Sequence, residues 1–323
     1  MTTTFNATST ATEVLAEQDL RNKRILITGI SSGIGFETAS ALIARGANVV
    51  GSVRDAAAVA DSCAAIEVSA SKSGGKLEVI ELDLGSLASV RASADRLIAA
   101  GRKFDVIIAN AGVMATPERR TADGFELQLG VNHLGHFVLI NRLGPLINEA
   151  GRVVVLSSTG HRAADVDFDD PNFDRGFYDR WIAYGRSKTA NALFAVEFDR
   201  RYRKFGVRAC SVMPGASVTP LVRYLSQDDL LSLTTAIESA RKELGLTPLQ
   251  YKTPAQAAAT TVWAAFIADG EEIGGRYLED CAVAEVDERP GFIDGVMPYA
   301  VNPDQARRFW QKSEELVAES FRE

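Results

Sequence analysis

The sequence contains few cysteines, and their arrangement argues against two kinds of stabilised fold. There are three, Cys63, Cys210 and Cys281, so their number is odd and they lie far apart. A disulfide framework uses paired cysteines, and a structural zinc site uses Cys and His residues at close spacing. We therefore predict reduced thiols and no metal site.

Basic residues are outnumbered as well. The chain has 35 Lys and Arg residues against 42 Asp and Glu residues, which gives a formal net charge of −7. Binding to nucleic acid depends largely on basic side chains that displace counterions from phosphates. We therefore expect no nucleic-acid partner.

Long apolar runs are missing too. No stretch of about 18 uncharged apolar residues, the length that crosses a bilayer, occurs in the sequence. Residues 1–20 are rich in Thr, Ala and Ser, and they lack the basic start and apolar run of a secretion signal. We expect no integral membrane segment, a cytoplasmic location, and a flexible arm over residues 1–20.

What the sequence does contain is a regular alternation of short apolar runs and helical patterns. This rhythm predicts a single α/β domain over residues 21–323, with a doubly wound, Rossmann-type parallel sheet of about seven strands and helices on both faces. The expected strands are 25–27, 48–53, 77–82, 105–109, 152–156, 207–212 and 274–278, and the expected helices are 36–45, 56–71, 86–100, 125–143, 184–205, 255–268 and 303–320.

Two longer segments, 159–183 and 216–253, interrupt the rhythm. Segments of that length in a folded domain are commonly lids or binding loops. We expect both to contact the substrate.

A glycine-rich turn joins the first expected strand to the first expected helix. Such a turn lets the backbone approach a phosphate, and the N–H groups and positive end of the helix then face the anion. A plain tight turn is the alternative, because the commonest dinucleotide-binding fingerprint has a glycine where this chain has Ser31. The candidate phosphate-binding residues are Gly29, Ser31, Ser32, Gly33, Ile34 and Gly35.

Small or polar residues also follow the ends of the other expected strands. In a parallel sheet these ends share one edge, where ligands bind near the point at which the strand order reverses. The residues are Arg54, Asp83, Leu84, Asn110, Ala111, Gly112, Ser157, Ser158, Pro214 and Gly215.

Tyr184 and Lys188 stand one helical turn apart on one face of an expected helix. By itself this spacing is common on solvated helices. However, the two residues occur in the same chain as the glycine turn, Asn110-Ala111-Gly112, Asn132 and Ser158. This combination, in this order, resembles the short-chain dehydrogenase/reductase family over roughly residues 23–278.

Three stretches, 131–137, 183–191 and 277–281, are similar to the retinol-dehydrogenase-like branch of that family. Two departures accompany the similarity. The membrane-anchoring N-terminal segment of many animal members is not recognised in the sequence, and Ser217 stands where an apolar residue is usual.

Tyr184 and its neighbours make chemical sense for reduction of a carbonyl, which needs a proton donor to the developing alkoxide. A tyrosine has a pKa of about 10 in water, and we expect the Lys188 ammonium to bring the pKa of Tyr184 toward neutral pH. Ser158 is expected to hydrogen-bond the substrate oxygen, with Ser157 as the alternative.

The resemblance implies roles for the remaining candidates. Lys188 is expected to bind the nicotinamide ribose as well, and Asn132 to hold a relay water that links Lys188 to solvent, unless Asn132 is a buried amide that satisfies helix backbone. Asp83 and Leu84 would touch the adenine. Asn110, Ala111 and Gly112 would support the adenine-ribose side, and Pro214, Gly215 and Thr219 would wall the nicotinamide.

The expected cofactor is NADP(H). An acidic residue after the second strand would favour NAD, but this chain has Val53 there, followed by Arg54. A guanidinium can fork a 2′-phosphate, and Ser31 can add a hydroxyl. The alternative is a surface arginine paired with Asp55.

These features predict an NADPH-dependent oxidoreductase that interconverts a ketone or aldehyde and an alcohol. A bulky or hydrophobic small-molecule substrate is expected from the aromatic and apolar residues of the two long segments. The alternatives are a non-catalytic NADP-binding regulatory protein and a dehydratase or epimerase on the same fold. A homodimer or homotetramer through the helices of Asn132 and Tyr184 is left open, and His133, His136 and His161 receive no role.

Overall fold

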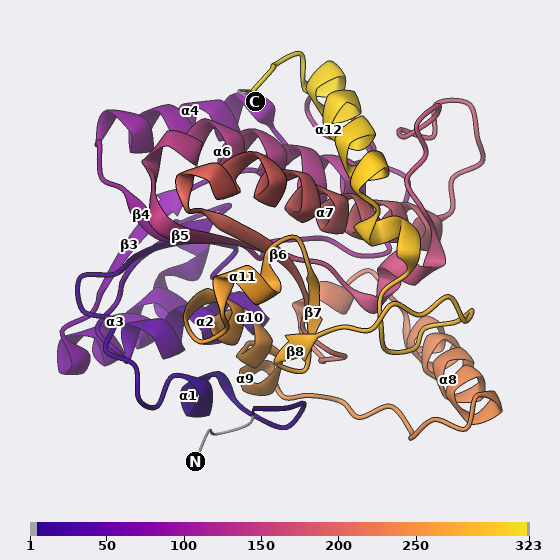
Figure 1. The fold of residues 1–323 in the computed structure, drawn as a ribbon, viewed down its shortest axis with the longest axis horizontal. Coiled ribbons are helices and arrows are strands. Elements are labelled where there is room, and N and C mark those ends of the chain that lie inside the picture. Colours follow the sequence, from indigo (N-terminus) through magenta and orange to yellow (C-terminus); the bar gives the residue numbers. More distant parts are fainter. Residues whose placement is uncertain (1–4, 322–323) are drawn as a thin grey trace.

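An eight-stranded sheet forms the centre of the molecule, with the strand order β3-β2-β1-β4-β5-β6-β7-β8 (Figure 1). The structure, a computed structural model, describes residues 5–321, and at positions 58, 60–63, 65, 67 and 69 only the backbone is described. Seven strands run parallel and β8 pairs antiparallel with β7. The strands are β1 (Arg24–Thr28), β2 (Asn48–Val53), β3 (Lys76–Glu81), β4 (Phe104–Ala109), β5 (Ile147–Leu156), β6 (Arg208–Met213), β7 (Tyr277–Glu279) and β8 (Ala282–Val283).

Helices cover both faces of the sheet, because alternate strand residues point to opposite sides. Leu26 of β1 belongs to the core under one helix layer, whereas its neighbours Ile25 and Ile27 belong to the core under the other. The first layer holds α4 (Leu87–Ala99), α6 (Gly135–Leu143), α7 (Arg180–Tyr202) and α12 (Pro303–Val317). The second layer holds α1 (Ala11–Val14), α2 (Gly33–Ile43), α3 (Ala60–Ser73), α10 (Ala259–Phe266) and α11 (Gly270–Ile273).

The predicted doubly wound α/β fold is confirmed, with local differences. The strand expected at 274–278 corresponds to β7, and β8 adds a further strand outside it, which the sequence pattern did not predict. The helix expected from 184 begins at Arg180, because the Asp179 carboxylate caps it by accepting hydrogen bonds from the backbone N–H groups of Trp181 and Ile182. The helix expected at 125–143 consists of α5 (Leu127–Leu129), a π-helical turn (Gly130–Leu134) and α6.

The expectation of a flexible arm is wrong for residues 5–20. Ala11, Val14, Leu15 and Leu20 are all buried and belong to the core shared with α2 and α10. The short α1 is closed by a capping box between Thr10 and Glu13. Residues 1–4 lie outside the described part of the chain.

The C-terminal helix α12 lies across α6 and α7 (Figure 1). Trp310 of α12 stacks on Phe194 of α7 at 5.6 Å between ring centroids and meets Phe137 of α6 edge-on at 5.0 Å. A homodimer or homotetramer through these two helices was left open by the sequence. Helix α12 packs on both of them.

Segment 216–253 is not a structureless loop. It contains α8 (Gln227–Glu243), which stands apart from both helix layers (Figure 1), and it leads into α9 (Pro254–Ala257). The direction of strand addition reverses between β1 and β4, so a crevice for a ligand is expected at the carboxyl ends of these two strands.

Candidate active site

The glycine turn lies at that crevice, between the end of β1 at Thr28 and the start of α2 at Gly33. Gly29 has a φ of +74°, a conformation that residues with a Cβ rarely adopt. At Gly35 a Cβ would lie 2.1 Å from the carbonyl oxygen of Gly29, so only glycine fits there without displacing the backbone. The turn therefore brings bare backbone and a helix N-terminus to the cavity, as phosphate binding requires.

A polar network ties this turn to the end of β4. The Asn110 side-chain amide donates to the carbonyl oxygens of Thr28 and Gly29, at 2.8 Å and 3.1 Å. The Thr28 hydroxyl oxygen accepts from the backbone N–H groups of Asn110 and Ala111. The predicted supporting role of this tripeptide thus has a structural basis in bonds to β1 rather than in side-chain bulk.

One cavity of about 1180 Å³ opens along the carboxyl edge of the sheet. Its two ends differ, since one is formed by the glycine turn and the strand ends and the other by α8 and the loop that follows β8. Every residue predicted to bind cofactor lines it: Gly29, Ser31, Ser32, Gly33, Ile34, Gly35, Arg54, Asp83, Leu84, Asn110, Ala111, Gly112, Tyr184, Lys188, Pro214, Gly215 and Thr219.

Tyr184 and Ser158 meet in the middle of this cavity. Both lie beside Gly160, where a Cβ would stand 2.6 Å from the Tyr184 ring and 3.4 Å from the Ser158 hydroxyl oxygen, and Tyr184 is only 4% exposed. Ser157, the alternative to Ser158, donates its hydroxyl to the carbonyl oxygen of Lys188 at 2.8 Å. Because Ser157 is committed to α7 backbone, Ser158 is the serine that can act on a ligand beside Tyr184.

Lys188 stands over the ring of Tyr184, with its Nζ 5.7 Å from the ring centroid, and donates to the carbonyl oxygen of Leu156 at 3.0 Å. Burial lowers the pKa of Lys188 to about 8 and raises the pKa of Tyr184 to about 12. The prediction that Lys188 brings the pKa of Tyr184 toward neutrality is therefore wrong for the chain by itself. Burial disfavours the tyrosinate, and the neighbouring Ser158 lowers the pKa only in part.

Asn132 does not line the cavity. Its buried side chain accepts from the backbone N–H of Val113 at 2.8 Å and donates to the carbonyl oxygen of Val113 and to the Ser187 hydroxyl. Its own carbonyl oxygen, in the π-helical turn, accepts from His136 Nδ1 at 2.9 Å. The side-chain amide thus satisfies backbone, but that of the loop after β4 and not that of a helix as in the alternative interpretation, and the relay role stays a prediction.

The three histidines that the sequence left without a role are all buried, and burial lowers the pKa of His133 to about 3 and those of His136 and His161 to about 4. His133 packs in the core against α12, where it bonds Ser313. His136 accepts from the Thr28 hydroxyl, because its other nitrogen donates to the Asn132 carbonyl. His136 therefore joins the Asn132 turn to the end of β1.

His161 joins the catalytic turn to the C-terminal part of the chain. Its Nε2 accepts from the backbone N–H of Met297, so its Nδ1 carries the proton and donates to the carbonyl oxygen of Ser158 at 2.7 Å. The phenol of Tyr299 donates to the carbonyl oxygen of His161. Local sequence offers no sign of Met297 and Tyr299 as partners, since both lie more than a hundred positions away.

The other end of the cavity includes residues that sequence reasoning missed. Arg241 of α8 is buried and forms an ion pair with Asp294, and both line the cavity. Phe292 and Ile293 add apolar wall beside them. No local motif marks this pair, because its members are 53 positions apart.

Among the side chains that the structure describes, no group of three or more His, Cys, Asp or Glu residues is placed to hold a metal ion. None of the helices within residues 5–321 is both long and apolar enough to cross a bilayer.

Comparison with known proteins places the chain among oxidoreductases. The profile of the family described as short chain dehydrogenase matches residues 23–230. The short-chain dehydrogenase/reductase prx1 of Penicillium roqueforti is 37% identical over 97% of this chain and 91% of its own length. Human retinol dehydrogenase 14 is 35% identical over 92% of this chain and 87% of its own.

Solved structures agree with the sequence comparison. A protein from Mycobacterium paratuberculosis superposes with a TM-score of 0.71 at 32% identity and covers 98% of this chain and 100% of its own. A Burkholderia cenocepacia short chain dehydrogenase, solved in complex with NADP, shares the fold at 24% identity and a TM-score of 0.61, covering 81% of this chain and 98% of its own. The chain therefore belongs to the short-chain dehydrogenase/reductase family, close to its retinol-dehydrogenase-like branch.

Proposed function

We propose that the protein is an NADPH-dependent carbonyl reductase or alcohol dehydrogenase. The observation that carries this proposal is the position of Tyr184 and Ser158 beside Gly160, with Lys188 next to the Tyr184 ring, in the same cavity as the glycine turn. A proton donor and a charge-stabilising hydroxyl thus face the place where a nicotinamide ring would lie.

Reduction is the direction that the electrostatics of the pair support. Because the pKa of Tyr184 is about 12, its hydroxyl stays protonated at neutral pH and can donate to an alkoxide. Ser158 would hydrogen-bond the carbonyl oxygen and so stabilise the charge that develops on it. The reduced nicotinamide, when bound, supplies the hydride to the carbonyl carbon. Asn132 would connect Lys188 to solvent through its carbonyl oxygen, which can accept a second hydrogen bond.

The residues after β2 support NADP(H) over NAD. Val53 offers no carboxylate to a ribose hydroxyl, and the exposed Arg54 lines the adenosine end of the cavity together with Ser31. A guanidinium at this position can bind a 2′-phosphate in a forked arrangement. The Burkholderia cenocepacia dehydrogenase of the same fold was solved in complex with NADP, which is consistent with the proposal.

A bulky hydrophobic carbonyl compound or secondary alcohol is the substrate class that fits the other end of the cavity. Leu230, Leu233 and Ile237 of α8 line this end with Leu249 and Phe292. A wall of this kind favours apolar surface that leaves water on binding. We further propose that the enzyme works in the cytoplasm.

The test is replacement of the proton donor. Tyr184→Phe removes one hydroxyl, so NADPH oxidation with a panel of ketones, aldehydes and retinoids should fall by about 100-fold to 10,000-fold. NADPH should still bind, as measured by quenching of protein fluorescence. Full activity of this variant would refute the mechanism, and wild-type protein that binds NADPH without turnover of any carbonyl compound would favour a regulatory role.

A further inference from the structure

Helix α8 is attached to the molecule differently from the other long helices. Among the residues of α8, the one buried side chain is a charged one, Arg241. Its apolar residues Leu230, Leu233 and Ile237 recur at helical spacing on one face and line the cavity instead of a core. By contrast, most side chains of α7 from Ala183 onward are buried. Packing against a core therefore does not fix α8.

Ion pairs at its two ends hold α8 in place. In the first turn Asp229 pairs with Arg180 at the start of α7. In the last turn Arg241 forms a forked pair with Asp294, at 3.2 Å and 3.1 Å, and its Nε donates to the carbonyl oxygen of Thr247 at 2.6 Å. The Arg241 side chain is 7% exposed and that of Asp294 is 60% exposed. Two-pronged contact of this kind fixes both direction and distance.

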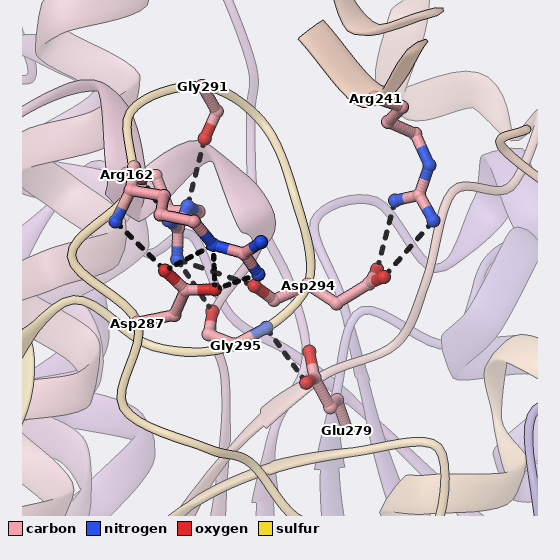
Figure 2. Close-up of polar contacts among 8 residues, drawn as sticks. Arg162, Arg241, Glu279, Asp287, Gly291, Asp294 and Gly295 are labelled. Carbon is pink, nitrogen blue, oxygen red and sulfur yellow. Dashed lines mark hydrogen bonds and ion pairs between the residues drawn. The ribbon is translucent and has the colours of Figure 1, made fainter. Parts of the chain in front are cut away.

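Asp294 is itself held by residues from the catalytic region (Figure 2). The buried Arg162 donates to the carbonyl oxygens of Gly291 and Gly295, on either side of Asp294, at 2.9 Å and 3.3 Å. The Glu279 carboxylate accepts from the backbone N–H of Gly295 at 2.8 Å. These hydrogen bonds therefore hold the backbone of the loop that carries Asp294.

Arg162 belongs to the short 3₁₀ helix Thr159–Ala163 that directly follows Ser158. Its neighbour His161 donates to the Ser158 carbonyl oxygen and accepts from Met297. Hydrogen bonds and short stretches of backbone therefore connect Ser158, through His161, Arg162 and the loop that carries Asp294, to Arg241 on α8. These contacts fix the distance between the reacting end of the cavity and its apolar wall.

We propose that the Arg241–Asp294 ion pair, named the clasp, determines substrate specificity. It holds the apolar face of α8 against bulky substrates, and Arg162 positions Asp294 for this contact. The inference rests on the proposed carbonyl reduction. Neither Arg241 nor Asp294 touches the reacting carbonyl, so the pair acts on affinity and not on the chemical step. The KM of a substrate too small to reach α8 should therefore not depend on this ion pair.

The test compares two ketones with the same reacting ring, cyclohexanone and 4-phenylcyclohexanone, at saturating NADPH. Arg241→Met and Asp294→Asn should raise KM for the larger ketone about fivefold or more. The kcat for both ketones, and KM for cyclohexanone, should stay within about twofold of the wild-type values. Asp294→Asn leaves the bond from Arg241 to Thr247 in place, so it separates the ion pair from the stability of the helix end.

Two further variants complete the design. The exchanged pair Arg241→Asp with Asp294→Arg should recover most of the lost affinity for 4-phenylcyclohexanone. Arg307→Met, which removes an exposed ion pair with Asp304 on α12, is the matched control and should change nothing. An equal rise of KM for both ketones, or wild-type kinetics in Arg241→Met and Asp294→Asn, would overturn the inference.

Hydrogen exchange provides a measurement that does not depend on turnover. In the NADPH-bound protein, backbone amides of residues 227–243 should exchange faster in Arg241→Met and Asp294→Asn, and at the wild-type rate in Arg307→Met. Unchanged exchange in the two clasp variants would overturn the clasp even in an active enzyme. If the exchange behaves as expected but neither ketone is reduced, the failure lies with the proposed reaction and its substrates.

Discussion

The two ends of the cavity are built in different ways. At the cofactor end, β1, the glycine turn and α2 are contiguous in the chain, and Gly35 lies so close to Gly29 that a single methyl group would not fit. At the substrate end, α8 contributes an open apolar face and is held by side chains from distant positions, above all Asp294. The comparison teaches that one contiguous stretch of backbone forms the end proposed for the cofactor, whereas apolar side chains held by long-range ion pairs form the end proposed for the substrate.

The largest expected effect comes from filling the tight end. In Gly35→Ala, the new Cβ would lie 2.1 Å from the Gly29 oxygen and 2.4 Å from the Asn110 amide nitrogen, so the turn must shift. We expect NADPH affinity to fall by about 100-fold, as measured by fluorescence titration. Circular dichroism checks that the chain still folds. Gly176→Ala, with only Asp170 at 3.4 Å, is the control, and equal NADPH affinity in both variants would contradict the comparison.

A second change keeps the turn and alters the charge beside it. Arg54→Asp should weaken NADPH binding by about 10-fold to 100-fold and leave NADH binding equal or improved, because a carboxylate repels a 2′-phosphate and can bind a ribose hydroxyl. The exposed Lys72 on α3 does not line the cavity, so Lys72→Asp changes the net charge equally and serves as control. Undiminished NADPH affinity in Arg54→Asp would refute the assignment of NADP(H).

Lys188 and Tyr184, which lie between the two ends of the cavity, should determine how the reaction rate depends on pH. Lys188 has a pKa of about 8, so it carries its charge below that pH and loses it above. Its charge offsets the negative charge that Tyr184 acquires on giving up a proton. The kcat/KM for ketone reduction should therefore fall about tenfold per pH unit well above pH 8.

Ionisation of Tyr184 itself cannot cause that fall, because its pKa is about 12. In Lys188→Arg the charge persists at all these pH values, so the decline should disappear even if the overall rate drops. Rate profiles from about pH 6 to about pH 10 provide the measurement. A flat wild-type profile across this range would show that the charge of Lys188 is not needed.

The smallest effect is expected from a substitution on the apolar face of α8. Leu233→Ala should raise KM for a bulky ketone about fivefold, with NADPH affinity unchanged and stability lowered by less than about 0.5 kcal/mol. The fully buried Leu193 of α7 is the contrasting position, and Leu193→Ala should cost about 2–5 kcal/mol in urea unfolding. A comparable loss of stability in Leu233→Ala would mean that α8 belongs to the core.

Much of the cofactor end could be predicted from the sequence. The glycine spacing, the alternation of strands and helices and the residues at the strand ends were sufficient to place Gly29, Arg54 and Tyr184 at one edge of a sheet. These features depend on local backbone rules and on the common direction of parallel strands, which neighbouring residues express. The family assignment from the same motifs is confirmed by the relatives.

The predictions that failed concern burial and long-range contact. The pattern of residues 5–20 did not show that Leu15 and Leu20 would pack against α2 and α10, because a short segment has too few positions to reveal the face that it buries. The expected effect of Lys188 on Tyr184 rested on the charge alone. Burial of Tyr184, which only the packed structure defines, raises its pKa instead.

The amino-acid sequence by itself thus determined the fold class, the family and the residues that line the proposed cofactor end of the cavity, because each is encoded in runs of a few adjacent positions. Tertiary structure alone decided the roles of His136 and His161, the state of Tyr184 and the link between Arg241 and Asp294. The physical reason is that hydrogen bonds, ion pairs and desolvation depend on which distant side chains meet in space, and no local pattern records that meeting.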